Sequence, residues 1–267
     1  AHTETIRLGA GGIMLPNHAP LLIAEQFGTL GALFPGRIDL GLGRAPGSDQ
    51  NTMLALRRDP ASADSFPQDV LELQGYLTGH SRVPGVQAVP RPELPVPLYI
   101  LGSSLFGAQL AAQLGLPYAF ASHFAPDALH RAIAVYREQF QPSEQLSSPY
   151  VIAGANVFAA DDQAAAMEQR TVAYRARTRS MLTRGVRGGN FTDAEVDAFL
   201  ASPNGAGLAA MTRYTAAGTP AEVRDYLSAF AEETGADELI LAHHAMSVTD
   251  RVRSVELTGE AMAGAAA

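Results

Sequence analysis

The chain has 267 residues, of which 47% are hydrophobic and 17% charged, which is typical of a globular protein and not of a disordered one. Its net charge of −8 disfavours nucleic acid and anionic membranes as partners, and no apolar run is long enough to cross a bilayer. The lack of cysteine excludes disulfides, thiolate metal sites and cysteine nucleophiles. Since no secretory signal opens the sequence, we expect a cytoplasmic protein.

The first predicted strand, over residues 6–15, is unusual because glycines interrupt its middle. They are Gly9, Gly11 and Gly12. Glycine weakens a strand unless a bulge, a rare backbone geometry or a close ligand needs the space that side chains would fill. A plain bulge is the simplest of these explanations. A helix with apolar residues at helical spacing is predicted to follow over residues 20–34.

A second strand, over residues 37–43, ends at Arg44 and a loop rich in glycine and proline. The carboxyl ends of strands are where α/β barrels and doubly wound sheets display functional groups. A guanidinium there can bind a phosphate or carboxylate through two hydrogen bonds, whereas an arginine on an outer helix is usually solvated. Arg44 is therefore a candidate anion-binding residue. Helices over 53–58 and 67–77 follow, and the proline-rich residues 83–97 are predicted to be irregular.

Residues 98–116 are predicted to form a strand, a tight turn and a helix. Gly102 allows the turn, and Ser103 or Ser104 can cap the helix. The first amide N–H groups of a helix have no internal partners and carry partial positive charge, so this turn suits an anion, above all a phosphate. An ordinary capped turn without a ligand is the alternative.

The rest of the chain continues the alternation of strands and helices. Strands are predicted over 118–122, 150–159 and 238–242, and helices over 127–140, from 161 onward, after Pro220 and over 247–263. His123, after the first of these strands, is either an acid/base group or a polar loop residue. His243 and His244 are adjacent on a strand, so their side chains point to opposite faces and make a poor joint metal site. Residues 185–217 are expected to be irregular with short helices, as in a lid or insertion.

Six strands alternating with helices predict an α/β protein with a parallel sheet. A closed barrel needs eight such units, whereas an open doubly wound sheet needs about six. Counting alone therefore favours the open sheet.

Three long stretches of the chain change that interpretation. They are RLGAGGIMLPNHAPLLIAEQFGTLGALFPGRIDLGLGRAPG, LYILGSSLFGAQLAAQLGLPYAF and AAGTPAEVRDYLSAFAEETGADELIL. In this order they resemble the flavin-dependent monooxygenases of the bacterial luciferase-like family. The resemblance implies a single TIM-type (βα)8 barrel domain over residues 1–267, aligned from the family's third strand, so that about six βα units are visible and the N-terminal units are missing. Because the family's histidine-containing segment beside the flavin would precede Ala1, no catalytic base is assigned.

The resemblance also implies a flavin site. The residues that would hold the FMN phosphate are Arg44, Ser104, Phe106 and Gly107. Gly11 and Gly12 match the place where the family bends its third strand under the flavin ring, often through a non-proline cis peptide. Ser103 and Ser122 are further candidates for the pocket wall. No metal site is expected.

The implied chemistry is oxygenation of a small organic substrate. Reduced FMN, delivered by a separate NAD(P)H-dependent flavin reductase, would react with O2 to a flavin hydroperoxide that oxidises the substrate, and the family habit implies a homodimer. A deazaflavin coenzyme used for hydride transfer is one alternative. A second is a flavin-binding protein that sequesters flavin without turnover. A third is a phosphosugar enzyme on the same barrel, which would keep Arg44 and Ser104 but have no use for the glycine bend.

Overall fold

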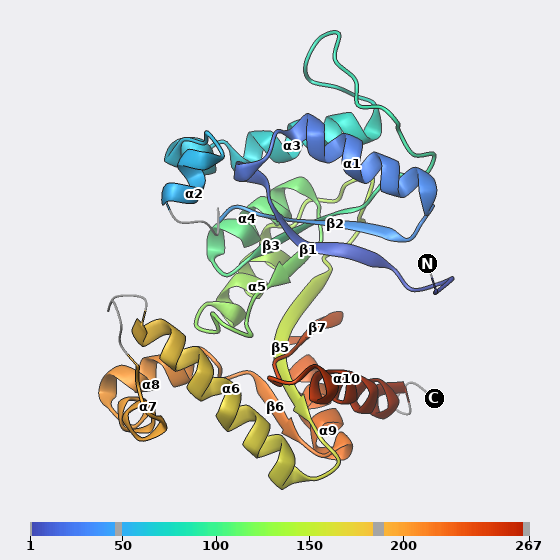
Figure 1. Ribbon diagram of the computed structural model, residues 1–267. Coiled ribbons are helices and arrows are strands. Elements are labelled where there is room, and N and C mark those ends of the chain that lie inside the picture. Colours follow the sequence, from blue (N-terminus) through green and yellow to red (C-terminus); the bar gives the residue numbers. More distant parts are fainter. Residues whose placement is uncertain (1, 46–49, 184–189, 264–267) are drawn as a thin grey trace. The chain divides into compact units, whose positions relative to one another are not determined.

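The computed structural model describes residues 2–45, 50–183 and 190–263 (Figure 1). The chain divides into two compact units. The first unit comprises residues 1–119 and 131–150, and the second comprises residues 120–130 and 151–267.

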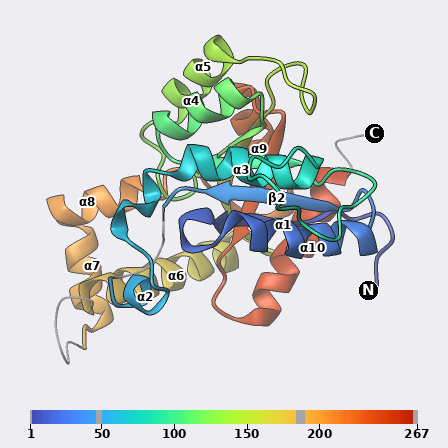
Figure 2. The same ribbon diagram turned by 90° about the horizontal axis from the view of Figure 1, so that it is seen from above.

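The first unit is built on parallel strands that alternate with helices. Its strands are β1 (Leu8–Met14), β2 (Ile38–Gly43), β3 (Leu98–Gly102) and β4 (Tyr118–Phe120), which ends at the boundary of the unit. Its helices are η1 (Leu15–Asn17), α1 (Pro20–Leu33), α2 (Gln50–Ala55), η2 (Pro60–Ala63), α3 (Phe66–Thr78), α4 (Leu105–Leu114) and most of α5 (Leu129–Gln139). Strand β2 pairs in parallel with β1 on one side and with β3 on the other. Helices α1 and α3 pack against each other and run alongside β2 (Figures 1 and 2).

The glycines of β1 allow a very close approach to β2. A Cβ atom on Gly12 would lie 2.6 Å from the carbonyl oxygen of Gly41, and one on Gly41 would lie 2.4 Å from that of Ala10. The pairing register shifts between Gly11 and Ile13, so the bulge predicted from the glycine cluster is present. The peptide bond between Gly11 and Gly12 is cis, in agreement with the family resemblance.

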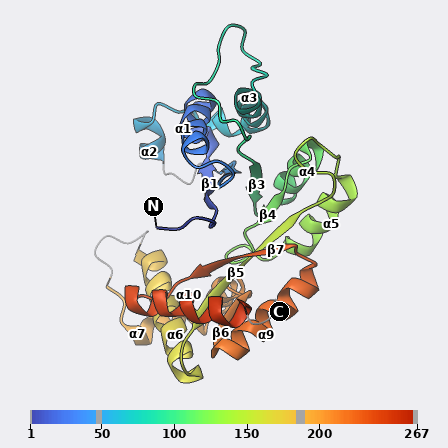
Figure 3. The ribbon, with the colours of Figure 1, turned by 90° about the vertical axis from the view of Figure 1, so that its right-hand side faces the viewer.

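The second unit is centred on β5 (Val151–Ala159), in which every residue is buried. Strand β5 pairs in parallel with β6 (Thr215–Gly218) and with β7 (Glu238–His243). The helices are α6 (Gln163–Thr183), α7 (Asp193–Leu200), α8 (Pro203–Ala210), α9 (Pro220–Thr234) and α10 (Val248–Ala263). Helices α9 and α10 pack against each other, and α10 also packs on β5 (Figure 3). None of the helices in the described part of the chain has both the length and the apolar character that crossing a membrane requires.

The sequence located the six predicted strands, but it missed β6. Residues 185–217 were expected to be irregular with short helices; α7 and α8 are those helices, residues 185–189 lie outside the described residues, and Thr215–Gly218 is a strand. Its sequence, TAAG, carries little intrinsic strand preference. The pairing with β5 makes this segment a strand.

Candidate functional site

The carboxyl ends of three neighbouring strands in the first unit meet at one edge. In the pairing register Met14 is opposite Gly43, and Gly43 is opposite Leu101. Arg44 therefore leaves β2 beside the turn that follows β3. Because the carboxyl ends of parallel strands carry the functional loops of α/β proteins, this edge is the candidate site.

Arg44 is held by an aromatic ring of helix α4. Its guanidinium carbon lies 4.1 Å from the centroid of the Phe106 ring, and the side chain is exposed. Stacking on an aromatic face stabilises a guanidinium and leaves the N–H groups at its edge available. Within residues 2–45, 50–183 and 190–263, Arg44 has no acidic partner. The positive group is thus held beside the first turn of α4, with no carboxylate partner among the described residues.

The turn before α4 differs from the expected capped turn. Ser104 occupies the position that precedes the helix, but its side chain makes no capping hydrogen bond. The prediction that a serine caps this helix is therefore wrong, because the exposed hydroxyls of Ser103 and Ser104 do not occupy the first N–H groups of α4. With no capping side chain among the described residues, those N–H groups and the positive end of the helix dipole suit an anion.

Tyr118 stabilises this turn, a role that sequence reasoning missed. Its buried hydroxyl donates a hydrogen bond of 3.0 Å to the carbonyl oxygen of Ser104, and burial raises the pKa of the Tyr118 hydroxyl well above its usual range. A Cβ atom on Gly107 would lie 3.3 Å from Cε2 of Tyr118. Glycine at position 107 therefore allows α4 to pack closely against the Tyr118 ring. A bulky polar-tipped residue in a short buried strand is the signal that could have identified Tyr118.

Ser122, which sequence reasoning placed in the pocket wall, belongs to the second unit and is fully buried. Its hydroxyl donates to the carbonyl oxygen of Gly154 at 2.6 Å and accepts from the N–H of Gly154 at 3.0 Å. The hydroxyl thus acts as both donor and acceptor, and the two hydrogen bonds connect the segment after β4 to strand β5. Ser122 thus has a structural role in its own unit.

His123 follows Ser122 and packs its ring against the backbone of Gly154. A Cβ atom on Gly154 would lie only 2.4 Å from Nδ1 of His123, and this nitrogen is buried without a hydrogen-bond partner. Burial lowers the pKa of His123 to about 4, with smaller electrostatic effects of His244 and Arg177. The imidazole is therefore neutral at physiological pH.

The two later histidines differ in their surroundings. Nδ1 of His243 lies 2.8 Å from the hydroxyl of the fully buried Ser254, which also accepts from the N–H of Ala159. His243 is thus a packed residue. His244 is exposed and lines a cavity in the second unit. In the described part of the chain, no group of three or more His, Asp and Glu side chains is arranged to hold a metal ion.

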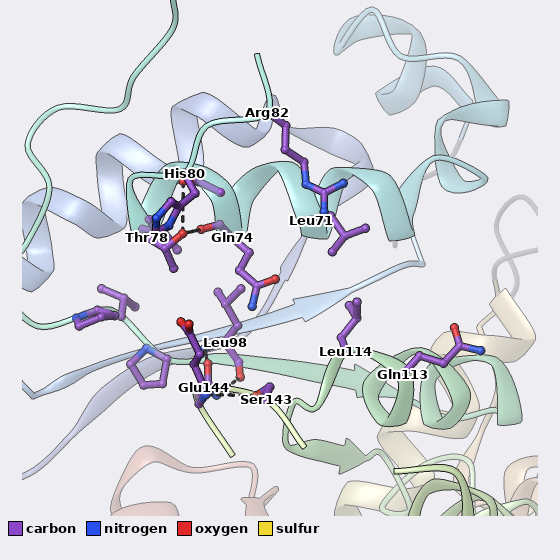
Figure 4. Close-up of a pocket in the computed structure, with 16 residues that line it drawn as sticks. Leu71, Gln74, Thr78, His80, Arg82, Leu98, Gln113, Leu114, Ser143 and Glu144 are labelled. Atoms are coloured by element: carbon purple, nitrogen blue, oxygen red, sulfur yellow. Dashed lines mark hydrogen bonds between the residues drawn. The ribbon is translucent and has the colours of Figure 1, made fainter. Parts of the chain in front are cut away.

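A cavity of about 560 Å3 in the first unit lies away from the candidate site. It is lined by residues of α3 and α4 and of the loop at 143–145, around Leu98 (Figure 4). Gln145 closes part of it by bonding both the N–H and the carbonyl oxygen of Leu98. Leu98 is the first residue of β3, so this cavity is at the amino end of the strand, whereas Ser103 is at the carboxyl end. It therefore does not belong to the candidate site.

Comparison with known proteins identifies the family of the chain. The family model for luciferase-like monooxygenases matches residues 1–238. A luciferase-like monooxygenase of Escherichia coli (strain K12) is 45% identical over 264 residues, covering 96% of this chain and 77% of that protein. The crystal structure of apo-MsnO8 matches with a TM-score of 0.83 and 35% identity, covering 97% of this chain and 79% of that chain.

The chain therefore belongs to the luciferase-like monooxygenase family, and its fold is the parallel α/β fold of the TIM-barrel type. The open doubly wound sheet that strand counting favoured is wrong. Counting misled because both architectures alternate the same strands and helices, so the number of units in a chain does not by itself distinguish them.

More distant structures share the fold and differ in cofactor. The oxygenating constituent of 3,6-diketocamphane monooxygenase from Pseudomonas putida, solved in complex with FMN, matches with a TM-score of 0.64 at 17% identity, covering 96% of this chain and 78% of that one. An F420-dependent secondary alcohol dehydrogenase, solved in complex with an F420-acetone adduct, matches with a TM-score of 0.68 at 17% identity, covering 97% of this chain and 80% of that one. At this level of identity the likeness supports the fold alone.

Proposed function

We propose that this protein is a monooxygenase that binds reduced FMN at the edge formed by β1, β2 and β3 and uses O2 to oxidise a small organic substrate. The observation that carries the proposal is the position of the Arg44 guanidinium, which has no carboxylate partner among the described residues, beside the amino end of α4, which Ser104 does not cap. A phosphate monoester is the group that such a pair of partial and full positive charges would bind.

The residues present fit the cofactor on two independent grounds. The first turn of α4 offers backbone N–H groups that no side chain of Ser104 occupies, and Arg44 is fixed beside them by Phe106. The close packing of Gly12 on Gly41 leaves the strand surface without side chains there, which favours approach of a flat ring.

Each group of this chain would have a limited task. Arg44, the first N–H groups of α4 and the hydroxyls of Ser103 and Ser104 would bind the phosphate, while Gly107 and Tyr118 hold the helix end in position. The bound cofactor supplies the redox chemistry with O2. The surrounding apolar strands would orient it and exclude water. We propose further that a separate reductase supplies reduced FMN and that the protein works as a cytoplasmic homodimer, as the family resemblance implies.

Two alternative functions would use the same phosphate site. A deazaflavin coenzyme would also present a phosphate to Arg44, and a flavin-sequestering protein would bind FMN without oxidising a substrate.

The test is a titration of the purified protein with FMN and with the deazaflavin coenzyme, followed by rapid mixing of the loaded, reduced protein with O2. The proposal predicts preferred binding of FMN and reoxidation kinetics that differ from those of free reduced FMN. Tighter binding of the deazaflavin would favour the hydride-transfer alternative. Tight binding of FMN with the reoxidation rate of free flavin would favour sequestration.

A further inference from the structure

The second unit contains a cavity of about 440 Å3 that the proposed cofactor site does not use. Its polar lining residues are Asn156 of β5, Arg177 of α6 and His244, which follows β7. Alanines of α6, together with Tyr174 and Met246, form the apolar part of the wall. The volume is in the range of small-molecule sites, and the mixture of apolar wall and few polar groups is typical of them.

Arg177 differs from the arginines on either side of it in α6. Arg175 pairs with Asp197 at 2.5 Å, and Arg179 pairs with Asp193. Residues 175 and 179 share a helix face, whereas residue 177 lies about 200° round the helix from residue 175. Arg177 therefore faces away from this ion-pair cluster and lines the cavity, half-buried. In the described ranges it has no acidic partner.

A second arginine, Arg251, is close enough to His244 to affect its pKa. The pKa of His244 is lowered first by burial and then by the positive charges of Arg177 and Arg251. The guanidinium of Arg251 donates hydrogen bonds to the backbone carbonyl oxygens of Ala245 and Met246, not to a carboxylate. The cavity thus has a fixed positive charge that no acidic side chain among those described neutralises. An anionic ligand would bind in such a place.

Asn156 adds a second requirement on the ligand. It is only 2% exposed, and its amide nitrogen donates to the carbonyl oxygen of His123 at 2.7 Å. Its Oδ1 atom is buried and has no hydrogen-bond partner. Because buried acceptors are nearly always paired in proteins, this oxygen at the cavity wall favours a ligand that carries an N–H or O–H donor.

We propose that this cavity binds an organic carboxylate whose charge is held by Arg177, beside the hydrogen-bonding ring of His244, and whose neighbouring N–H or O–H group donates to Oδ1 of Asn156. The proposal rests on residues of the second unit alone and goes beyond the proposed cofactor site. The apolar wall would take the remaining part of the molecule.

The test uses N-acetylglycine, which has a carboxylate next to an N–H donor, and N-acetylglycinamide, which has the same shape without the charge. Their affinities for the full chain are measured by ligand-detected NMR in the absence of flavin. We expect the carboxylate to bind at least about tenfold more tightly than the amide. Arg177→Gln should abolish that difference, and Arg177→Lys should restore part of it.

Arg224→Gln is the matched control, because Arg224 lies on α9 and pairs with its neighbour Asp225. It should leave both affinities unchanged. Equal binding of the two probes to the wild-type protein, or no detectable binding of N-acetylglycine, would overturn the proposal, as would retention of the difference in Arg177→Gln while thermal denaturation shows a folded variant. A parallel FMN titration of the wild-type protein tests the proposed function separately. Failure to bind FMN would count against the monooxygenase and not against the carboxylate site.

Discussion

The guanidinium of Arg44 stacks on the ring of Phe106, with 4.1 Å between the guanidinium carbon and the ring centroid. This contact joins the end of β2 to the first turn of α4. Two parts of the chain separated by a long, proline-rich connection thereby contribute to one anion site.

Replacing Arg44 should affect the phosphate of the cofactor and not its ring. We expect Arg44→Ala to weaken FMN binding roughly 10–100-fold, the loss of one or two hydrogen bonds to a charged group, and to leave riboflavin binding unchanged. Fluorescence titration with both ligands measures this, with Arg224→Ala as the surface control. An equal loss for FMN and riboflavin would mean that Arg44 does not contact the phosphate.

Tyr118 should act as a positioning residue. Tyr118→Phe removes the hydroxyl that donates to the carbonyl oxygen of Ser104, so we expect a loss of about 1 kcal/mol in unfolding free energy and weaker FMN binding with riboflavin unaffected. Urea denaturation and FMN titration test the two effects. Tyr226→Phe is the control, because the Tyr226 hydroxyl donates a long hydrogen bond of 3.4 Å to the carbonyl oxygen of Arg213 within the second unit. Unchanged FMN affinity in Tyr118→Phe would remove Tyr118 from the site.

Gly12 of β1 should not tolerate a larger residue, because its neighbour Gly41 leaves no room for a side chain. Gly12→Ala would place a Cβ atom 2.6 Å from the carbonyl oxygen of Gly41, so we expect it to destabilise the protein by about 1–3 kcal/mol. A Cβ atom on Gly259, in α10, would meet nothing within 4 Å, and Gly259→Ala should stabilise by about 0.5–1 kcal/mol. Thermal denaturation of both variants gives the comparison, and similar melting temperatures would contradict the close strand packing.

Gly154 and His123 should be energetically linked. Gly154→Ala would bring a Cβ atom within 2.4 Å of Nδ1 of His123, so the alanine variant should lose stability. In the double variant Gly154→Ala with His123→Ala, part of that loss should be recovered because the ring is gone. A double-mutant cycle measured by urea denaturation yields the interaction energy, and strictly additive effects would show that the two residues do not touch.

Acid should destabilise the protein through its buried histidine. Because the pKa of His123 in the folded state is about 4, below its ordinary value of 6.5, the unfolded chain binds the proton more strongly than the folded protein. The stability contributed by neutral His123 is therefore present above about pH 6.5 and is lost as the pH falls towards about 4. His243 and His244, whose pKa values are also lowered, act in the same direction.

Melting temperatures at several pH values across that window measure the effect. His123→Gln should show a smaller fall in melting temperature than the wild type between about pH 7 and about pH 5. His130→Gln, at an exposed position, is the control. If the two variants lost the same amount, the effect would not come from His123.

Most residues of the candidate site in the first unit could be singled out from the sequence. Arg44 was found because it follows an apolar strand, and the serine pair was found because it follows a strand and precedes helix formers. The cap was predicted wrongly, since the sequence shows which residue can cap a helix but not whether its hydroxyl turns towards the N–H groups. The hydrogen bonds of Ser122 could not be predicted for a similar reason. Only the position of β5 shows that the Ser122 hydroxyl donates to and accepts from the backbone of Gly154.

Local patterns in the sequence determined the alternation of strands and helices, the glycine bulge and the basic residue at the end of β2, because each depends on residues close together in the chain. The tertiary structure alone decided the short strand β6, the stacking of Arg44 on Phe106 and the cavity lined by Asn156, Arg177 and His244. These features arise from residues tens of positions apart, and the contacts that create them exist only after the strands have paired.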